Sequence, residues 1–168
     1  MKLKVTGKQP NSKSCFVCGL ENGYGLNSRF YELENGEIMA RFSPSDEHQG
    51  YPGRLHGGLA ATILDETIAR AMMSHEKSAV WGVTVEFSMK LRKPVPLDRE
   101  VIVIARITEE NRRTFHGTGE IVLGDGSVAV EGSGRYIKMA LPKITDFDFD
   151  DEGWHVVEQE DDPVEVDR

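Results

Sequence analysis

One carboxylate in this sequence stands in the middle of an otherwise apolar helix. The stretch from His56 to Glu66 reads HGGLAATILDE, and its apolar pattern continues to Ser74, which predicts a helix over residues 57–74. Burial of an unpaired carboxylate costs several kcal/mol, so a chain keeps one mainly where chemistry or a specific partner requires it. At about 100° per residue, Asp65 falls on a stripe of small and apolar side chains made of Gly58, Ala61, Thr62, Ile68, Ala69 and Met72.

This spacing separates two neighbouring acids. Asp65 shares the apolar stripe, whereas Glu66 lies about a quarter-turn away with Arg70 four residues further on, the arrangement of an ordinary surface ion pair. Asp65 is therefore the candidate catalytic group, and its alternative is a helix residue that faces solvent.

The two glycines at the helix start supply a second candidate function. Without Cβ atoms, Gly57 and Gly58 let a ligand approach closely, and first-turn N–H groups have no partner within the helix. Such donors can stabilise an oxyanion, and we expect Gly58 to do so. His56 is either part of this site or a polar residue that closes the preceding loop.

The order His56-Gly57-Gly58, six residues, then Asp65 resembles the hotdog-fold acyl-CoA thioesterases of the phenylacetate-pathway (PaaI-like) type. The resemblance covers roughly residues 26–141. It implies that Asp65 acts as nucleophile or general base and that the Gly-Gly backbone polarises the thioester carbonyl. It also implies that Thr84, within GVTVEF, lies near the site.

One position departs from the family pattern. Many relatives carry an Asn six residues before the His, where it orients the attacking water, and here that position is Gly50. Gln49 beside it could serve after a shift of one residue. The resemblance further implies a homodimer or a dimer of dimers with sites at the subunit interface, and no cofactor other than the coenzyme A that is part of the substrate.

The order of elements predicts an α+β hotdog fold, in which a curved antiparallel sheet wraps one central helix. Strand patterns cover residues 26–33, 37–43, 81–92, 101–107, 114–123 and 128–139, and Asn35-Gly36 predicts a hairpin turn. The helix is apolar on most of its circumference, so it must be covered on more than one side. We expect an N-terminal arm at 1–14, the hotdog domain at 15–141 and an acidic tail at 142–168 that is either disordered or docked.

The same alternation bears on Thr84. In residues 81–92 the odd positions are apolar and the even positions mostly polar, which indicates one buried face. Thr84 is on the polar face, so we expect it to point away from the Asp65 of its own chain and to serve a neighbouring subunit at most.

Charge patterning favours a small phosphorylated ligand. Residues 146–168 hold 11 acids and one base, a net charge of −10 within the total of −8, so residues 1–145 carry +2. This balance suits coenzyme A better than nucleic acid, which demands a dense basic face. The expected phosphate contacts are Lys90, Arg92 and Lys93, followed by Arg112 and Arg113, although charges at a strand end also discourage aggregation.

Two cysteines, in the motif Cys15-Phe16-Val17-Cys18, form half of a zinc site. No His pair at suitable spacing completes it, and the motif does not begin a helix as a redox pair would. We therefore expect a packed N-terminal turn rather than a metal or redox site. No run approaches the ~20 apolar residues of a membrane span, and residues 1–14 lack the apolar core of a signal peptide. We therefore expect a cytoplasmic protein with no membrane partner.

Two classes of function fit these observations. The first is a thioesterase that hydrolyses an acyl-CoA or a related thioester, with Asp65 as nucleophile or base. The second is a non-catalytic acyl-CoA binding or sensing module on the same fold. A hydratase is a weaker third reading, because the Asp and His of such enzymes lie closer together than His56 and Asp65.

Overall fold

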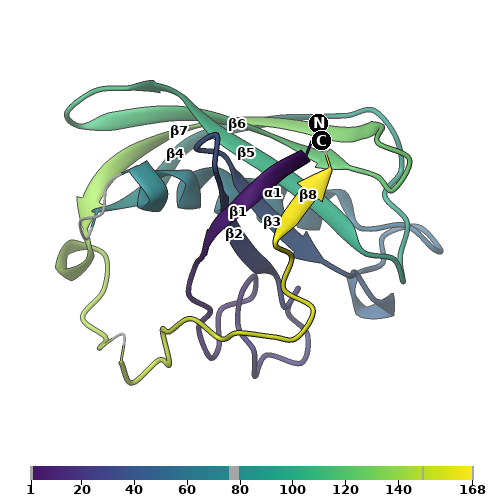
Figure 1. Cartoon of the computed structure of the whole chain (residues 1–168), viewed down its shortest axis with the longest axis horizontal. Helices are drawn as coiled ribbons and strands as arrows, with labels where there is room; N and C mark the ends of the chain where they lie inside the picture. The colour runs from purple at the N-terminus through teal and green to yellow at the C-terminus, as the bar shows by residue number, and fades with distance from the viewer. Residues whose placement is uncertain (1, 76–79, 149, 168) are drawn as a thin grey trace.

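The computed structural model describes residues 2–75, 80–148 and 150–167. Within these residues, one helix, α1 (Gly57–His75), lies against an antiparallel sheet of eight strands (Figure 1). The strands in chain order are β1 (Lys2–Lys8), β2 (Arg29–Leu33), β3 (Ile38–Phe42), β4 (Val80–Leu91), β5 (Val101–Glu110), β6 (Thr114–Val122), β7 (Val128–Ala140) and β8 (Glu165–Asp167). Two short 3-10 helices, η1 (Asp46–His48) and η2 (Leu141–Lys143), lie in the connections.

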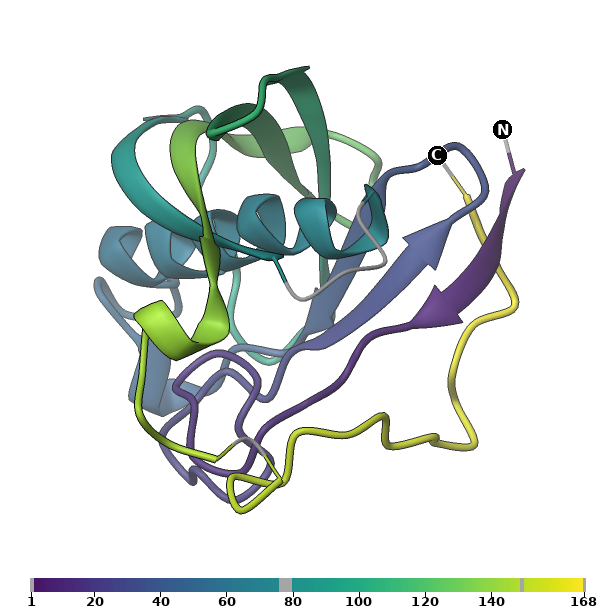
Figure 2. The same cartoon turned by 90° about the vertical axis from the view of Figure 1, so that its left-hand side faces the viewer.

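The strands pair in the order β4-β7-β6-β5-β3-β2-β1-β8, and every neighbouring pair is antiparallel. Figure 2 shows the long strands arching over one side of α1. The predicted α+β hotdog architecture is therefore confirmed. The predicted Asn35-Gly36 hairpin is confirmed as well, with Gly36 at a φ of +83° that favours glycine.

Helix α1 is covered on two sides, as its apolar circumference predicts. Ile63, Leu64, Ile68 and Met72 are fully buried, and the helix contacts β3 to β7. Figure 2 shows the segment between β1 and β2 on the opposite side of α1. Val17 and Cys18 of this segment join the main core cluster. The sheet alone therefore does not complete the core.

A glycine lets the sheet approach the helix closely. A Cβ added to Gly117 on β6 would lie 2.5 Å from the Cγ2 of Ile68, closer than real Cβ contacts. Any side chain here would push β6 away from α1. Glycine inside a strand commonly permits such a close approach.

Both ends of the described chain belong to the sheet. Residues expected as an N-terminal arm form β1, which pairs with β2, and the acidic tail returns to add β8 beside β1. Between η2 and β8 the tail runs under the N-terminal segment (Figure 2). Asp162 anchors it there, because its carboxylate accepts hydrogen bonds from Lys8 Nζ (2.6 Å) and Tyr31 Oη (2.7 Å). The tail is thus docked.

Among the residues that the structure describes, no helix has both the length and the apolar character needed to cross a bilayer.

Candidate active site

The side chain of Asp65 projects from the middle of α1 toward β4 and β7. The Thr84 hydroxyl lies 2.9 and 3.1 Å from its two carboxylate oxygens and donates to them. The Tyr136 hydroxyl, from β7, donates to Oδ1 at 3.0 Å. Asp65 itself is half-buried. One exposed edge of a carboxylate held by two hydroxyl groups can therefore meet a substrate.

The expected orientation of Thr84 is wrong, and a β-bulge explains why. In the pairing of β4 with β7, Thr84 is opposite Tyr136 but Glu86 is opposite Arg135, so Val85 is an extra residue. A bulge reverses which alternate positions face the core. Phe87 and Met89 pack against the core as the alternation predicts, whereas before the bulge Thr84 turns toward its own α1.

Tyr136 is a site residue that sequence reasoning missed. Its ring is fully buried and stacks on Phe115 with centroids 4.8 Å apart. Glycines make room for it: a Cβ on Gly134 would lie 2.6 Å from its hydroxyl oxygen, and one on Gly82 would lie 3.4 Å from its ring. A tyrosine two residues after a glycine, inside a strand expected to cover the helix, was the signal available in the sequence.

The surroundings of Asp65 change its basicity. Burial raises the pKa of Asp65 above its ordinary value, and hydrogen bonds from Thr84 and Tyr136 lower it again without cancelling the rise. The neighbouring Glu66 charge also raises the pKa. Burial and the adjacent Asp65 carboxylate raise the pKa of Tyr136 far above that of a free phenol, so Tyr136 stays protonated and donating. Asp65 is consequently a stronger base than a surface aspartate.

The helix start differs from the expectation in one respect. The Gly58 N–H donates to the Nδ1 of His56 at 2.9 Å, so the donor expected to hold an oxyanion is engaged. His56 is exposed, and its carbonyl accepts from the Ala60 N–H as the residue preceding the helix. Within the described part of the chain, the N–H of Gly57 has no acceptor. Gly57 is thus the more available donor.

The two halves of the expected site lie far apart within one chain. Asp65 is eight positions after Gly57, and a helix rises about 1.5 Å per residue, which gives about 12 Å. One thioester carbonyl spans far less than this distance. The structure therefore does not bring the backbone donors and the carboxylate of the same chain onto one carbonyl.

The Gln49 side chain forms a hydrogen bond within the turn of residues 49–53. Its Oε1 accepts the Gly53 N–H at 2.9 Å, and its side chain is exposed. A Cβ on Gly50 would lie 3.0 Å from the Cα of His56, so the position that carries Asn in many relatives is crowded here. Gln49 does not reach Asp65 in this arrangement.

The expected basic residues fall into two groups at opposite ends of the sheet. Lys90, Arg92 and Lys93 lie at the end of β4, where the Leu91 side chain would be 3.6 Å from a Cβ on Gly57. This group is therefore near the helix start. Arg92 is paired with Glu131 at 2.8 Å.

Arg112 and Arg113 lie in the hairpin between β5 and β6, where the Lys138 N–H donates to the Arg113 carbonyl. On β7, Glu131 is opposite Lys90, and Lys138 lies beside Arg113. These two β7 residues are seven positions apart, so the two basic groups are about 23 Å apart along the strand. They do not form one site.

Comparison with known proteins identifies one family of relatives. Residues 52–130 match the family model described as the thioesterase superfamily. Acyl-coenzyme A thioesterase THEM4 of Rattus norvegicus is 31% identical over 110 residues, covering 64% of this chain and 46% of that protein. The chain spans about half the length of the curated relatives that it matches.

Solved structures agree on the fold. A thioesterase superfamily protein matches with a TM-score of 0.67 at 26% identity, over 73% of this chain and 59% of that one. The Escherichia coli PaaI protein of the phenylacetic acid degradation operon matches with a TM-score of 0.61 at 15% identity, over 68% and 81%. The resemblance seen in the sequence is thereby confirmed: the chain has the hotdog fold, and its residues 52–130 match the thioesterase superfamily model.

Proposed function

We propose that this chain hydrolyses acyl-CoA thioesters to a free acid and coenzyme A. The observation that carries the proposal is the Asp65 carboxylate, half-buried on α1, raised in basicity by burial and oriented by the hydroxyl groups of Thr84 and Tyr136. A base or nucleophile of this kind is what thioester hydrolysis requires. The family match over 52–130 and the relatives named acyl-coenzyme A thioesterases support the same reaction.

Two routes are compatible with this geometry. In the first, Asp65 takes a proton from a water molecule while the water oxygen attacks the thioester carbonyl. The C–S bond then breaks, and the proton passes from Asp65 to the departing thiolate. In the second, Asp65 attacks the carbonyl and releases the thiolate, and water then hydrolyses the resulting anhydride. In both, a backbone N–H stabilises the carbonyl oxygen as it becomes negative. Neither route needs a separate cofactor.

We propose that two chains share each site. Strand β4 is at one edge of the sheet, with Val85 and Leu91 exposed on it. If two β4 strands pair antiparallel about a twofold axis between Phe87 and Ser88, Thr84 is opposite the partner's Leu91. Since Leu91 lies beside Gly57 and Thr84 binds Asp65, this pairing brings a carboxylate of one chain to the helix start of the other.

The same pairing gives a place for the coenzyme A portion. The group made of Lys90, Arg92 and Lys93 is near the helix start, so it would lie beside the shared site. Phosphates held there would keep the thioester close to the backbone donor. We propose this group, and not the distant Arg112 and Arg113, as the phosphate contact.

The test of the activity is hydrolysis of a panel of acyl-CoAs, with thiol release followed spectroscopically. The panel spans short, long and aryl acyl groups, and saturable release on at least one supports the proposal. Tight binding of acyl-CoA without turnover of any member would replace it with the binding or sensing module.

A mixing experiment tests the shared site. Asp65→Asn and Gly57→Pro are each expected to be inactive alone. When the two variants are mixed and their subunits exchange at random, half of the dimers hold one copy of each variant, and each such dimer has one intact site of two. The mixture should therefore recover about a quarter of the wild-type sites. No recovery, with exchange verified by mass, would place both groups of a site in one chain.

A further inference from the structure

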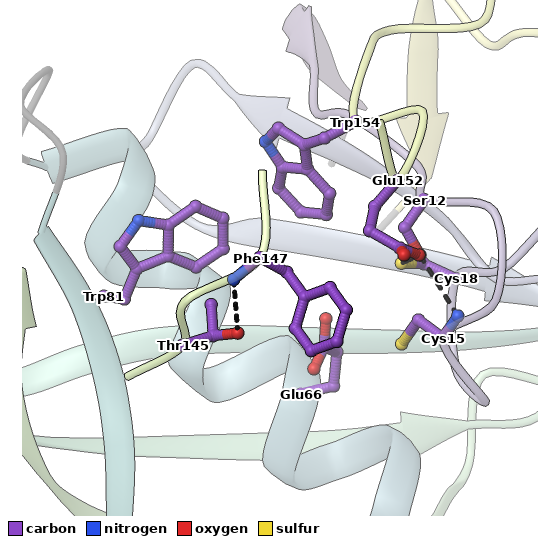
Figure 3. Close-up of a pocket in the computed structure, with 9 residues that line it drawn as sticks. All are labelled: Ser12, Cys15, Cys18, Glu66, Trp81, Thr145, Phe147, Glu152 and Trp154. Carbon is purple, nitrogen blue, oxygen red and sulfur yellow. Dashed lines mark hydrogen bonds between the residues drawn. The ribbon is translucent and has the colours of Figure 1, made fainter. Parts of the chain in front are cut away.

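On the other face of α1, the structure brings together three potential metal ligands that the sequence keeps far apart. The Sγ atoms of Cys15 and Cys18 and a carboxylate oxygen of Glu66 all lie within 4.8 Å of one another (Figure 3). Tetrahedral Zn²⁺ with Zn–S bonds of about 2.3 Å needs ligand atoms about 3.8 Å apart. Small side-chain rotations therefore suffice, and we propose that Cys15, Cys18 and Glu66 bind a zinc ion.

The backbone around the cysteines is arranged for thiolates. The Val17 N–H donates to Cys15 Sγ at 3.4 Å, and the Gly19 N–H closes the turn on the Cys15 carbonyl at 2.8 Å. A Cβ on Gly19 would lie 2.3 Å from that carbonyl oxygen, so the tight turn requires glycine. A turn that directs an N–H group at sulfur stabilises the deprotonated form that binds a metal.

Ser12 adds a second polar contact to the pair. Its Oγ accepts the Cys15 N–H at 3.2 Å and lies 3.4 Å from Cys18 Sγ. Either group can donate while Cys18 is a thiol, but once Cys18 is a thiolate only the Ser12 hydroxyl can donate, and the sulfur accepts. Outer-shell hydrogen bonds of this kind orient metal ligands and hold their charge.

The charges of the cluster balance when a divalent ion is present. Glu66 forms an ion pair with Arg70 at 2.8 Å, and the Arg70 side chain is only 3% exposed. Two thiolates and one divalent cation add no net charge to this neutral pair. Arg70 is also held over the ring of Phe30, so it is a fixed positive charge beside the site. Buried charge that is balanced in this way avoids most of the desolvation penalty of an unpaired ion.

A fourth coordination position faces a cavity. The cluster lines a cavity of about 360 Å³ whose other walls include Trp81, Phe147 and Trp154 (Figure 3). Phe147 and Trp154 come from the tail, so the tail closes the site from outside. Three protein ligands with the fourth position open is the arrangement of a zinc site that binds water or an exchangeable ligand. The ion would also tie the turn of residues 15–18 to α1.

This proposal departs from the expectation of no metal, and the reason is geometric. The sequence holds no His pair near the cysteines, whereas Glu66 follows Cys18 by 48 residues and is brought beside it by the fold. Thiolate ligands favour Zn²⁺ over Mg²⁺ or Ca²⁺. The site does not depend on the proposed thioesterase activity, because Glu66 pairs with Arg70 and lines the cavity of the cysteines, whereas Thr84 and Tyr136 bind Asp65.

The test uses the full chain, purified with a reductant that does not bind metals and titrated with Co²⁺ and then with Zn²⁺. We expect one Co²⁺ per chain with a thiolate-to-cobalt charge-transfer band, and its loss when Zn²⁺ displaces the cobalt. Cys15→Ser and Cys18→Ser should abolish the band. Glu66→Gln should weaken binding by more than the roughly 10–100-fold that loss of an outer-shell partner costs. Glu109→Gln, which removes an exposed acid from β5, is the control for charge and should bind as the parent does.

A second measurement needs no variant. In the wild-type chain, Zn²⁺ should protect both thiols from alkylation and a chelator should restore their reactivity. The proposal is overturned if the reduced chain takes up no Co²⁺ or Zn²⁺, if the band persists in Cys15→Ser, or if the thiols react equally fast with and without Zn²⁺. Formation of a Cys15–Cys18 disulfide by a chain that takes up no metal when reduced would assign the pair to redox chemistry instead.

Discussion

The hydroxyl of Thr84, on β4, lies 2.9 Å from Oδ1 of Asp65, on α1, and the two residues are 19 positions apart in the sequence. The contact exists because the bulge at Val85 turns this part of β4 toward α1. It leaves the carboxylate oriented before any substrate arrives. An oriented carboxylate loses little entropy on reaching the transition state, which is one source of catalytic rate.

Asp65→Asn should lower kcat by at least about a hundredfold, because the amide can neither accept a proton from water nor attack the carbonyl. The amide oxygen can still accept from Thr84, so the thermal unfolding midpoint should stay close to that of the parent. The measurement is steady-state kinetics with the best acyl-CoA, and Asp125→Asn, at an exposed hairpin, is the control. Parental turnover in a folded Asp65→Asn chain would remove Asp65 from the mechanism.

The pH dependence of kcat/KM should report the ionisation of Asp65. Activity requires the carboxylate, so it should fall as pH decreases through a midpoint that burial places above the ordinary aspartate value. Thr84 and Tyr136 lower this pKa by donating to the charged form, so Thr84→Val and Tyr136→Phe should each move the midpoint upward. Thr108→Val, an exposed position on β5, is the control. A midpoint that moves downward in both variants would contradict the assignment.

Gly57→Pro should remove one backbone donor and leave the helix intact. Gly57 is the first residue of α1, the position where proline is most favourable in a helix, and its φ is not positive. We expect kcat to fall by about a hundredfold, the scale of a lost oxyanion donor, with modest change in the affinity for a non-reactive CoA analogue. Gly57→Ala keeps the N–H and separates the effect of added bulk. If both variants lose activity equally, bulk and not the donor is responsible.

Arg92→Ala with Lys93→Ala should raise KM for acyl-CoA several-fold and leave kcat nearly intact, since a phosphate contact is the same in ground and transition states. KM of the parent should rise with ionic strength, and that rise should be smaller in the double variant. Arg112→Ala with Arg113→Ala removes the same charge from the far end of the sheet. A rise of KM in that second variant alone would move the phosphate contact there.

Local patterns in the sequence were sufficient to predict the helix and the long strands and to identify the carboxylate of the candidate site. The helix was expected at 57–74 and runs to His75, the long strands fall within a few residues of their patterns, and the stripe identified Asp65. These features depend on periodicity, which is a property of neighbouring residues.

The features that the sequence did not reveal depend on contacts between distant segments. The bulge at Val85 reverses the faces of β4, and no glycine or proline at that position indicates it in the sequence. Tyr136 is 71 positions from Asp65. The bond from Gly58 to His56 depends on one side-chain rotamer. The spacing of Glu66 and Arg70 predicts a surface ion pair, and no residue near Glu66 in the sequence indicates that Cys15 and Cys18 lie beside it in the fold.

The two outer strands of the sheet differ in a way that limits assembly. Strand β4 is long, whereas β8 has three residues and presents the carboxylates of Glu165 and Asp167. A short strand with like charges is a poor template for another copy, so a chain can add to a neighbour at one edge and not at both. If two chains pair through β4 as proposed, growth of the sheet stops at that pair, because the tail strand β8 does not offer the second edge that a continuous sheet across many chains needs.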